Sequence, residues 1–223
     1  MVRNRQQATS VVDTDPVAPI DPESAQDERL ITAAQNGDLP SFNALVTRHE
    51  RPVYGLCMRM LRVTSDAEDA TQETFIKAWT SLGAFRGGLF RPWLFRIATN
   101  VCYDALRAKG RRPAESLDLE MFEREPVWSS QAAVDDPEET AGRRELTKFL
   151  ERALGALPED QRLIVLLVDL YGYDYEEAAA ISGSAVGTVK SRLSRGRSKL
   201  RDLLRSDPST TEHFERYLRL SNE

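Results

Sequence analysis

The chain has 223 residues, of which 41% are hydrophobic and 29% are charged, and its formal net charge at pH 7 is −5. This length allows one or two small domains, each with a hydrophobic core of its own. No apolar run approaches the roughly 18 residues that would predict a membrane span, and the N-terminus lacks the apolar core of a signal peptide, so we expect a cytoplasmic protein.

Cysteine and histidine are too scarce to predict a metal centre or a disulfide. Cys57 and Cys102 lie within helical patterns without a partner at metal-binding spacing, and His49 and His213 are equally isolated. The cysteines are therefore expected to be buried, reduced thiols. Because the chain also lacks a phosphate-binding loop and a Ser-His-Asp set, we expect no enzyme activity, no catalytic residues and no cofactor.

The charges are distributed unevenly along the chain. Acidic residues concentrate in 13–28 and 115–139, whereas basic residues concentrate in 96–112 and 190–205. Binding to a polyanion depends on the local patch more than on the total charge, so the negative total remains compatible with a nucleic-acid partner.

Residues 1–26 are expected to form a disordered N-terminal extension, because their three prolines lie among Asp, Thr and Val without a period that could bury one face. From Asp27 onward the apolar spacing is helical. A first helix is predicted to end at Asn36 and Gly37, a second to follow, and a third to begin at Pro52, since proline is tolerated in a first turn. No segment alternates as a strand would, so the sequence predicts an all-α fold.

The next helix is predicted to be capped by Ser65 or Asp66, and its early acidic residues suit the positive end of the helix dipole. Its apolar spacing leaves a partly acidic face exposed. That face consists of Asp69, Gln72, Glu73 and Ile76. Solubility alone would explain it.

The segment 85–112 interleaves aromatic and arginine residues and carries a glycine pair before a helix predicted to begin near Pro92. Aromatic faces beside guanidinium groups can stack unpaired bases and hold the backbone of a single strand. Aromatic residues at helical spacing are more often core, so Trp93 and Phe95 fit a structural role equally well. The amide of Asn100 is placed to hydrogen-bond a base edge or, alternatively, a neighbouring backbone group. The candidate residues for binding a separated strand are Phe85, Arg86, Phe90, Arg91, Trp93, Arg96 and Asn100.

The segment 174–204 predicts a helix-turn-helix. Asp174 and Glu177 form a capping box for a short helix that ends near Ser182. Gly183 permits the left-handed turn that precedes a second helix.

The second of these helices carries a basic face. Between residues 190 and 205 only Asp202 interrupts the positive charges, whereas an ordinary exposed helix mixes signs. We therefore favour DNA contact over simple solvation: short side chains allow close entry to a major groove, and Arg and Lys reach bases or phosphates. The candidate residues are Ser184, Thr188, Lys190, Ser191, Arg192, Arg195 and Lys199.

The chain resembles an RNA polymerase sigma factor of the extracytoplasmic-function (ECF) type in four segments over roughly residues 27–204. They are, in the family's order, DAEDATQETFIKAW, FRPWLFRIATN, LPEDQRLIVLLVDLYGYDYEEAA and VGTVKSRLSRGRSKLRDLL. The resemblance implies two small helical domains, a region 2 helical bundle at 27–112 and a region 4 helix-turn-helix domain at 140–205. The acidic, proline-punctuated stretch 113–139 would be a flexible linker. The C-terminal tail at 206–223 extends beyond the usual end of the family, and its residues HFERYLRL are expected to form a short amphipathic helix.

The resemblance also implies partners. The acidic face at 69–76 would dock on the β′ clamp of core RNA polymerase, and region 4 on its β flap. The segment 85–100 would capture bases of the nontemplate strand in the minus-ten element of promoter DNA, and the basic face at 184–199 would read the minus-thirty-five element as duplex. An anti-sigma factor would hold the protein inactive, and a membrane-bound anti-sigma factor would be its one link to a membrane.

Two features depart from the family pattern. The turn at 182–185 replaces the Leu-Gly-Val-Pro string that family members often carry. Gly196 lies where Ala is common, which lowers helix propensity by about 0.8–1 kcal/mol. The helix-turn-helix motif survives both changes, and the upstream element that it prefers is expected to be unusual.

Two rival functions follow from parts of the same pattern. A stand-alone helix-turn-helix regulator would bind duplex DNA without polymerase and would not need the aromatic segment. A protein-binding helical adaptor would not engage DNA at all. Transcription initiation with added core polymerase separates both from a sigma factor.

Overall fold

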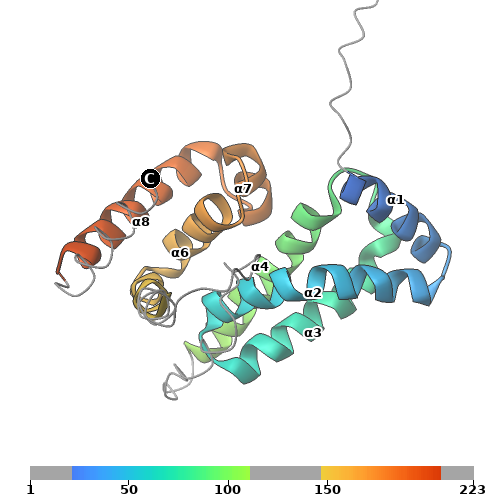
Figure 1. Cartoon of the computed structure of the whole chain (residues 1–223), viewed down its shortest axis with the longest axis horizontal. Helices are drawn as coiled ribbons and strands as arrows, with labels where there is room; N and C mark the ends of the chain where they lie inside the picture. Colours follow the sequence, from blue (N-terminus) through green and yellow to red (C-terminus); the bar gives the residue numbers. More distant parts are fainter. Residues whose placement is uncertain (1–21, 111–146, 207–223) are drawn as a thin grey trace, which may run out of the picture.

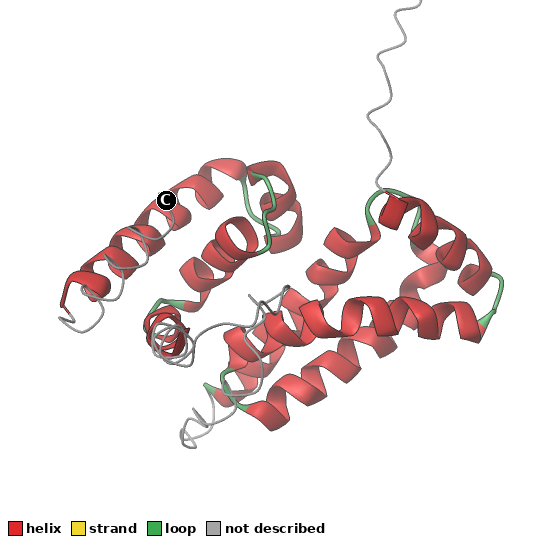
Figure 2. Ribbon diagram, in the orientation of Figure 1, coloured by secondary structure: helices red, strands yellow, loops and turns green. Residues whose placement is uncertain are grey.

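The computed structural model of the chain describes residues 22–110 and 147–206. The predicted N-terminal extension as far as residue 21, the acidic linker at 113–139 and the tail from residue 207 lie outside the described residues. Every regular element within the described ranges is helical, which confirms the predicted all-α fold (Figure 2). Across those ranges, no helix combines the length and the hydropathy that a membrane span requires.

The first domain is a bundle built around its longest helix, α2 (Figure 1). Its elements are α1 (Pro22–Gln35), α2 (Leu39–Leu61), α3 (Thr64–Ser81), the short 3₁₀ helix η1 (Leu82–Ala84) and α4 (Phe90–Lys109). α2 packs against α1, α3 and α4, and its side chains Leu45, Val53 and Leu56 are fully buried. Burial of each of these side chains contributes about 1.5–3 kcal/mol to stability. The packing of α2 therefore fixes the positions of α3 and α4.

The helices α1 and α3 begin earlier than the sequence predicted. α1 begins at Pro22 rather than at Asp27. α3 begins at Thr64 after Val63, which makes no side-chain cap, so the predicted cap from Ser65 or Asp66 is wrong. Packing of the inner face of α3 against α2 substitutes for the missing cap.

The predicted helix break at Pro52 is also wrong, because α2 runs through this residue as one helix. A proline inside a helix removes one backbone hydrogen bond and crowds the preceding turn. Here the helix face that follows is fully buried at Val53 and Leu56. Tertiary packing therefore outweighs the local cost of the proline.

A buried acidic side chain fastens α1 to α2. Asp27 is 7% exposed, and its carboxylate lies 2.6 Å from Nη1 of Arg48 and 2.8 Å from Nε2 of His49. Burial lowers the pKa of His49, although the hydrogen bond and charge of Asp27 act in the opposite direction. The position of α1 thus depends on a contact that responds to protonation of His49.

The second domain consists of a helical stretch at 147–155, α6 (Glu159–Val165) with its π-helical continuation η3 (Leu166–Leu170), α7 (Tyr175–Ser182) and α8 (Val186–Ser206). The predicted capping box is confirmed: Glu177 N donates to Asp174 Oδ1 at 2.8 Å, and Asp174 N donates to Glu177 Oε2 at 3.0 Å. Gly183 adopts the predicted left-handed conformation at φ 63°. α7, the turn and α8 therefore form the helix-turn-helix.

A glycine contact seats α8 on α6. Val189 and Leu193 of α8 are buried, and one turn further Gly196 is buried as well. A Cβ atom at Gly196 would lie 2.7 Å from Cγ2 of Val165. The glycine that lowers helix propensity thus permits the close approach of the two helices.

The two domains are in direct contact. The buried guanidinium of Arg162, in α6, donates to the carbonyl of Leu157 at 3.0 Å and to the carbonyl of Met60, in α2, at 2.9 Å. Phe95 of α4 is fully buried and meets Tyr171 edge to face, with ring centroids 4.8 Å apart. A buried guanidinium is tolerated only when its donors are paired, so these carbonyls hold the contact in one geometry.

Gly196→Ala should destabilise the protein by about 1–3 kcal/mol, because the added methyl group meets the stiff, buried Val165. The matched control is Gly187→Ala in the same helix, where a Cβ atom would meet nothing within 4 Å. That change should leave the free energy of unfolding within about 0.5 kcal/mol of the wild type, because Gly187 is exposed and lies in the first turn of α8. Denaturant unfolding measures both, and equal stability of the two variants would contradict the steric explanation.

Stability should fall more steeply with acid in the wild type than in His49→Gln. The pKa of His49 in the folded protein lies below its ordinary value of 6.5, so the unfolded chain takes up the proton first. The contribution of neutral His49 is therefore present above about pH 6.5 and is lost as the pH falls through the folded pKa. Unfolding free energies measured at steps from about pH 7 to pH 5 test this, and parallel curves for both proteins would refute it.

Candidate nucleic-acid interface

A loop at residues 86–89 (the Gly-rich loop) projects from the first domain between η1 and α4. Gly87 and Gly88 have φ values of 99° and 92°, which only glycine adopts without strain. Arg86 and Leu89 are exposed, and Leu89 exposes 55% of its surface. α4 begins immediately afterwards at Phe90, two residues before the predicted start, with Pro92 in its first turn. The loop therefore offers backbone and side-chain atoms to a ligand.

Three aromatic rings (the aromatic cluster: Phe85, Phe90 and Trp93) lie beneath this loop. Phe85 stands 6.0 Å from Phe90 and 5.2 Å from Trp93, and Phe90 stands 5.5 Å from Trp93, between ring centroids. Phe85 and Phe90 are only 9% and 4% exposed, and Trp93 is half-buried. The prediction that the faces of Phe85 and Phe90 are open to bases is corrected accordingly, because their hydrophobic surface is used to shape the loop.

The polar candidates on α4 divide into two groups. Arg96 and Asn100 are exposed and four residues apart, so they share one face of the helix. Within the described ranges, no hydrogen bond joins the side chain of Asn100 to a neighbouring backbone group. The guanidinium of Arg91 instead lies 5.4 Å from the ring centroid of Phe95 and 5.6 Å from that of Tyr173. Arg91 therefore takes part in the contact between the domains.

Leu89 and the tyrosines of the second domain were missed by the sequence analysis. An apolar residue directly after two glycines is a weak signal for an exposed contact. Tyr171 and Tyr173 pack edge to face against Phe95, 76 and 78 positions away, and no local pattern could have paired them.

The helix-turn-helix brings the second set of candidates together on α8 and its preceding turn. Lys190, Arg195 and Lys199 are exposed, whereas Ser184, Thr188 and Ser191 are partly buried. The last two of the exposed residues are four apart and therefore lie one above the other on the helix. The surface of α8 that faces solvent is basic along at least two turns.

Arg192 is held in place at the edge of this basic face. Its Nε lies 2.9 Å from Oδ2 of Asp160, its Nη1 donates to Oγ of Ser184 at 2.8 Å, and its side chain is 29% exposed. An arginine restrained by a carboxylate loses less conformational entropy on binding. Arg192 can thus contact a ligand only from a limited range of directions.

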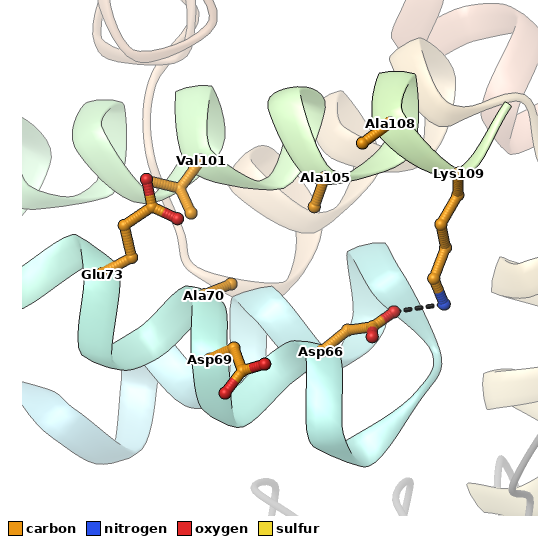
Figure 3. Close-up of a pocket in the computed structure, with 8 residues that line it drawn as sticks. All are labelled: Asp66, Asp69, Ala70, Glu73, Val101, Ala105, Ala108 and Lys109. Atoms are coloured by element: carbon orange, nitrogen blue, oxygen red, sulfur yellow. Dashed lines mark ion pairs between the residues drawn. The ribbon is translucent and has the colours of Figure 1, made fainter. Parts of the chain in front are cut away.

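A groove of about 570 Å³ separates α3 from α4 (Figure 3). The α3 side presents Asp66, Asp69 and Glu73, and the α4 side ends in Lys109, which is ion-paired with Asp66. Ala70, Val101, Ala105 and Ala108 complete the lining. The groove is therefore lined by small apolar side chains and flanked by carboxylates.

The other candidates on α3 are Gln72 and Ile76, which are exposed like Glu73. Glu73 pairs with Lys77 at 2.7 Å across one helical turn, and Gln72 is exposed. Ile76 exposes 64% of its surface and adds an apolar side chain to this polar face. The four predicted residues therefore form one continuous surface of mixed polar and apolar character.

Comparison with protein families gives two matches in chain order. Residues 45–112 match Sigma-70 region 2, and residues 150–200 match Sigma-70, region 4. The ECF RNA polymerase sigma-E factor of Escherichia coli K12 is 40% identical over 178 residues, which cover 78% of this chain and 92% of that protein. The RNA polymerase sigma-H factor of Pseudomonas aeruginosa is 37% identical over 177 residues, covering 77% and 90% respectively.

Two solved structures are similar over most of the chain. CnrH in complex with the cytosolic domain of CnrY gives a TM-score of 0.59 at 28% identity, covering 82% of this chain and 99% of that one. The sigma factor RpoE in complex with the anti-sigma factor NepR from Bartonella quintana gives 0.55 at 30% identity, covering 76% and 99%.

Proposed function

The chain belongs to the ECF RNA polymerase sigma factors, and on that premise we propose that it binds core RNA polymerase, directs it to specific promoters and assists promoter melting. The observation that carries this function is that two domains of one chain present two different candidate DNA surfaces. These are the Gly-rich loop with Arg96 and Asn100, and the basic face of α8. A duplex-binding regulator would need the second surface alone.

The first surface is proposed to capture the nontemplate strand of the minus-ten element. Leu89 and the half-buried Trp93 offer apolar contacts to an unstacked base, and stacking of one base on an aromatic ring contributes about 1–3 kcal/mol. Arg86 and Arg96 would hold phosphates, and Asn100 would hydrogen-bond a base edge. Phe85 and Phe90 support this surface from below. Binding free energy of this kind, rather than covalent chemistry, would keep the strands apart.

The second surface is proposed to read the minus-thirty-five element as duplex. Thr188 and Ser191 are short enough to let α8 approach the major groove, and Arg195 and Lys199 extend from it toward bases or phosphates. Arg192, restrained by Asp160, would approach the DNA in a fixed orientation. Lys190 and Ser184 complete the candidate set at the N-terminal end of the helix.

The surface of α3 is proposed to dock on the β′ clamp, and the second domain on the β flap. A clamp helix with basic and apolar residues fits the groove lined by Asp69 and Glu73, while the exposed Ile76 supplies apolar area. Such mixed surfaces are typical of protein interfaces that form and dissociate. Because polymerase performs the chemistry, the sigma factor itself is not a catalyst.

Regulation by an anti-sigma factor is proposed from the similar structures, because one of them is the sigma factor RpoE in complex with the anti-sigma factor NepR. The other is CnrH in complex with the cytosolic domain of CnrY. A partner that covered the groove beside α3 would compete with polymerase. We place the protein in the cytoplasm, where polymerase acts, with a membrane link only through a membrane-bound partner.

Run-off transcription tests the proposed function against the stand-alone regulator. Transcription from a promoter selected by the protein should require both core polymerase and this chain. Tight, specific duplex binding by the isolated protein without any gain in initiation would instead establish the regulator.

Arg195→Ala should weaken binding of the holoenzyme to the minus-thirty-five element by about 1–3 kcal/mol. The matched control is Arg205→Ala, which removes the same charge from the last turn of α8, beyond the candidate contacts. Electrophoretic mobility shifts with duplex upstream DNA measure the difference. If both variants bound equally well, Arg195 would contribute only general charge.

Asn100→Ala should impair promoter opening by about tenfold, the loss of roughly one hydrogen bond to a base, while duplex binding is retained. Permanganate reactivity of melted thymines measures opening. Asn43→Ala on the exposed side of α2 is the control for an asparagine change elsewhere. Equal opening by the wild type and Asn100→Ala on the same promoter would remove Asn100 from the capture surface.

A further inference from the structure

The last residue of α1 makes two hydrogen bonds to the segment at which the Gly-rich loop begins, η1 and Phe85. Gln35, the last residue of α1, donates from Nε2 to the carbonyl of Leu82 at 3.0 Å and to the carbonyl of Phe85 at 2.9 Å. These carbonyls lie at the start of η1 and directly after it. The amide group thus closes the turn from which the loop departs.

α1 also supports the residue at which the Gly-rich loop ends, Phe90, through the ring of His49. Phe90 begins α4, and its ring lies 5.3 Å from that of His49 in α2. His49 is in turn bonded at 2.8 Å to Asp27 of α1. Both ends of the Gly-rich loop are therefore connected to the same helix.

We propose that α1 positions the Gly-rich loop for capture of the separated promoter strand, with Gln35 as the main positioning residue. The inference rests on the proposed function of the loop. The match to Sigma-70 region 2 begins at residue 45, so α1 and Gln35 lie outside it. Two consecutive glycines would otherwise give the loop many conformations, and ordering them would reduce the affinity for DNA.

The location of Gln35 distinguishes a role in positioning the loop from a role in stabilising the whole bundle. The side chain is at an exposed helix end and contributes little to the core, whereas both of its hydrogen bonds end on carbonyls that flank η1. Removing the amide donors should therefore loosen residues 82–90 and leave the bundle intact.

The experiment compares Gln35→Glu and Gln35→Met with Asn36→Asp in complete holoenzyme. Gln35→Glu is isosteric but turns a carboxylate toward the two carbonyls, and Gln35→Met removes the donors without adding charge. Asn36→Asp adds the same charge one residue later, where the amide bonds only to Thr32 of its own helix. The probes are a single-stranded nontemplate oligonucleotide and an upstream duplex, both taken from promoters that the wild-type holoenzyme selects from a random pool.

We expect Gln35→Glu to bind the single strand about tenfold more weakly, because binding would then have to order the loop that the two hydrogen bonds now hold, and Gln35→Met to change in the same direction. Binding of the upstream duplex should stay within about twofold for every variant. Amide hydrogen exchange should accelerate at residues 82–90 in both Gln35 variants and not in Asn36→Asp.

Three results would overturn the inference. Single-strand binding by Gln35→Glu within about twofold of the wild type would show that the two hydrogen bonds of Gln35 are dispensable for capture of the strand. Equal losses on single strand and duplex, with exchange accelerated throughout the bundle, would show a structural role only. Failure of the wild-type holoenzyme to bind the single strand would overturn the proposed function, and the positioning role with it.

Discussion

The packing of the aromatic cluster beneath two glycines is the constraint on which the DNA-facing side of the first domain depends. Phe85 and Phe90 are buried against each other, and their packing fixes where the Gly-rich loop leaves η1 and where α4 begins. Arg96 and Asn100 are then presented from a rigid helix rather than from a mobile loop. Preorganisation of this kind lowers the entropy lost when a strand binds.

The second domain binds duplex DNA in our account, and this requires a helix that can enter a groove. α8 is held at its buried face by Gly196 against α6, and its opposite face carries Arg195 and Lys199. The negative total charge of the chain does not oppose this, since potentials act over about 8–10 Å at physiological salt. Contacts such as the buried pair of Arg59 and Glu151, 2.7 Å apart, join the two domains.

The sequence was sufficient wherever a structure is decided locally. The capping box at Asp174 and the left-handed Gly183 were predicted because their partners lie within four residues. The burial of Phe85 and Phe90 was not predictable. A sequence that alternates aromatic and arginine residues is compatible both with rings exposed for stacking on bases and with rings packed against one another. Three other features depend on segments that meet only after folding. They are the continuation of α2 through Pro52, the pairing of Arg192 with Asp160, and the hydrogen bonds of Gln35 to the carbonyls of Leu82 and Phe85.

The central claim is that one chain holds separated DNA at the Gly-rich loop and paired DNA at α8. It is tested most directly by hydroxyl-radical cleavage of promoter DNA in the open complex, from probes tethered to Leu89→Cys and, separately, to Lys199→Cys. The native thiols of Cys57 and Cys102 are buried and should not compete for the probe. We predict that the first probe cuts the nontemplate strand within the melted region and that the second cuts both strands of the upstream duplex. Cleavage of only duplex DNA by the Leu89→Cys probe, or of none, would contradict the claim.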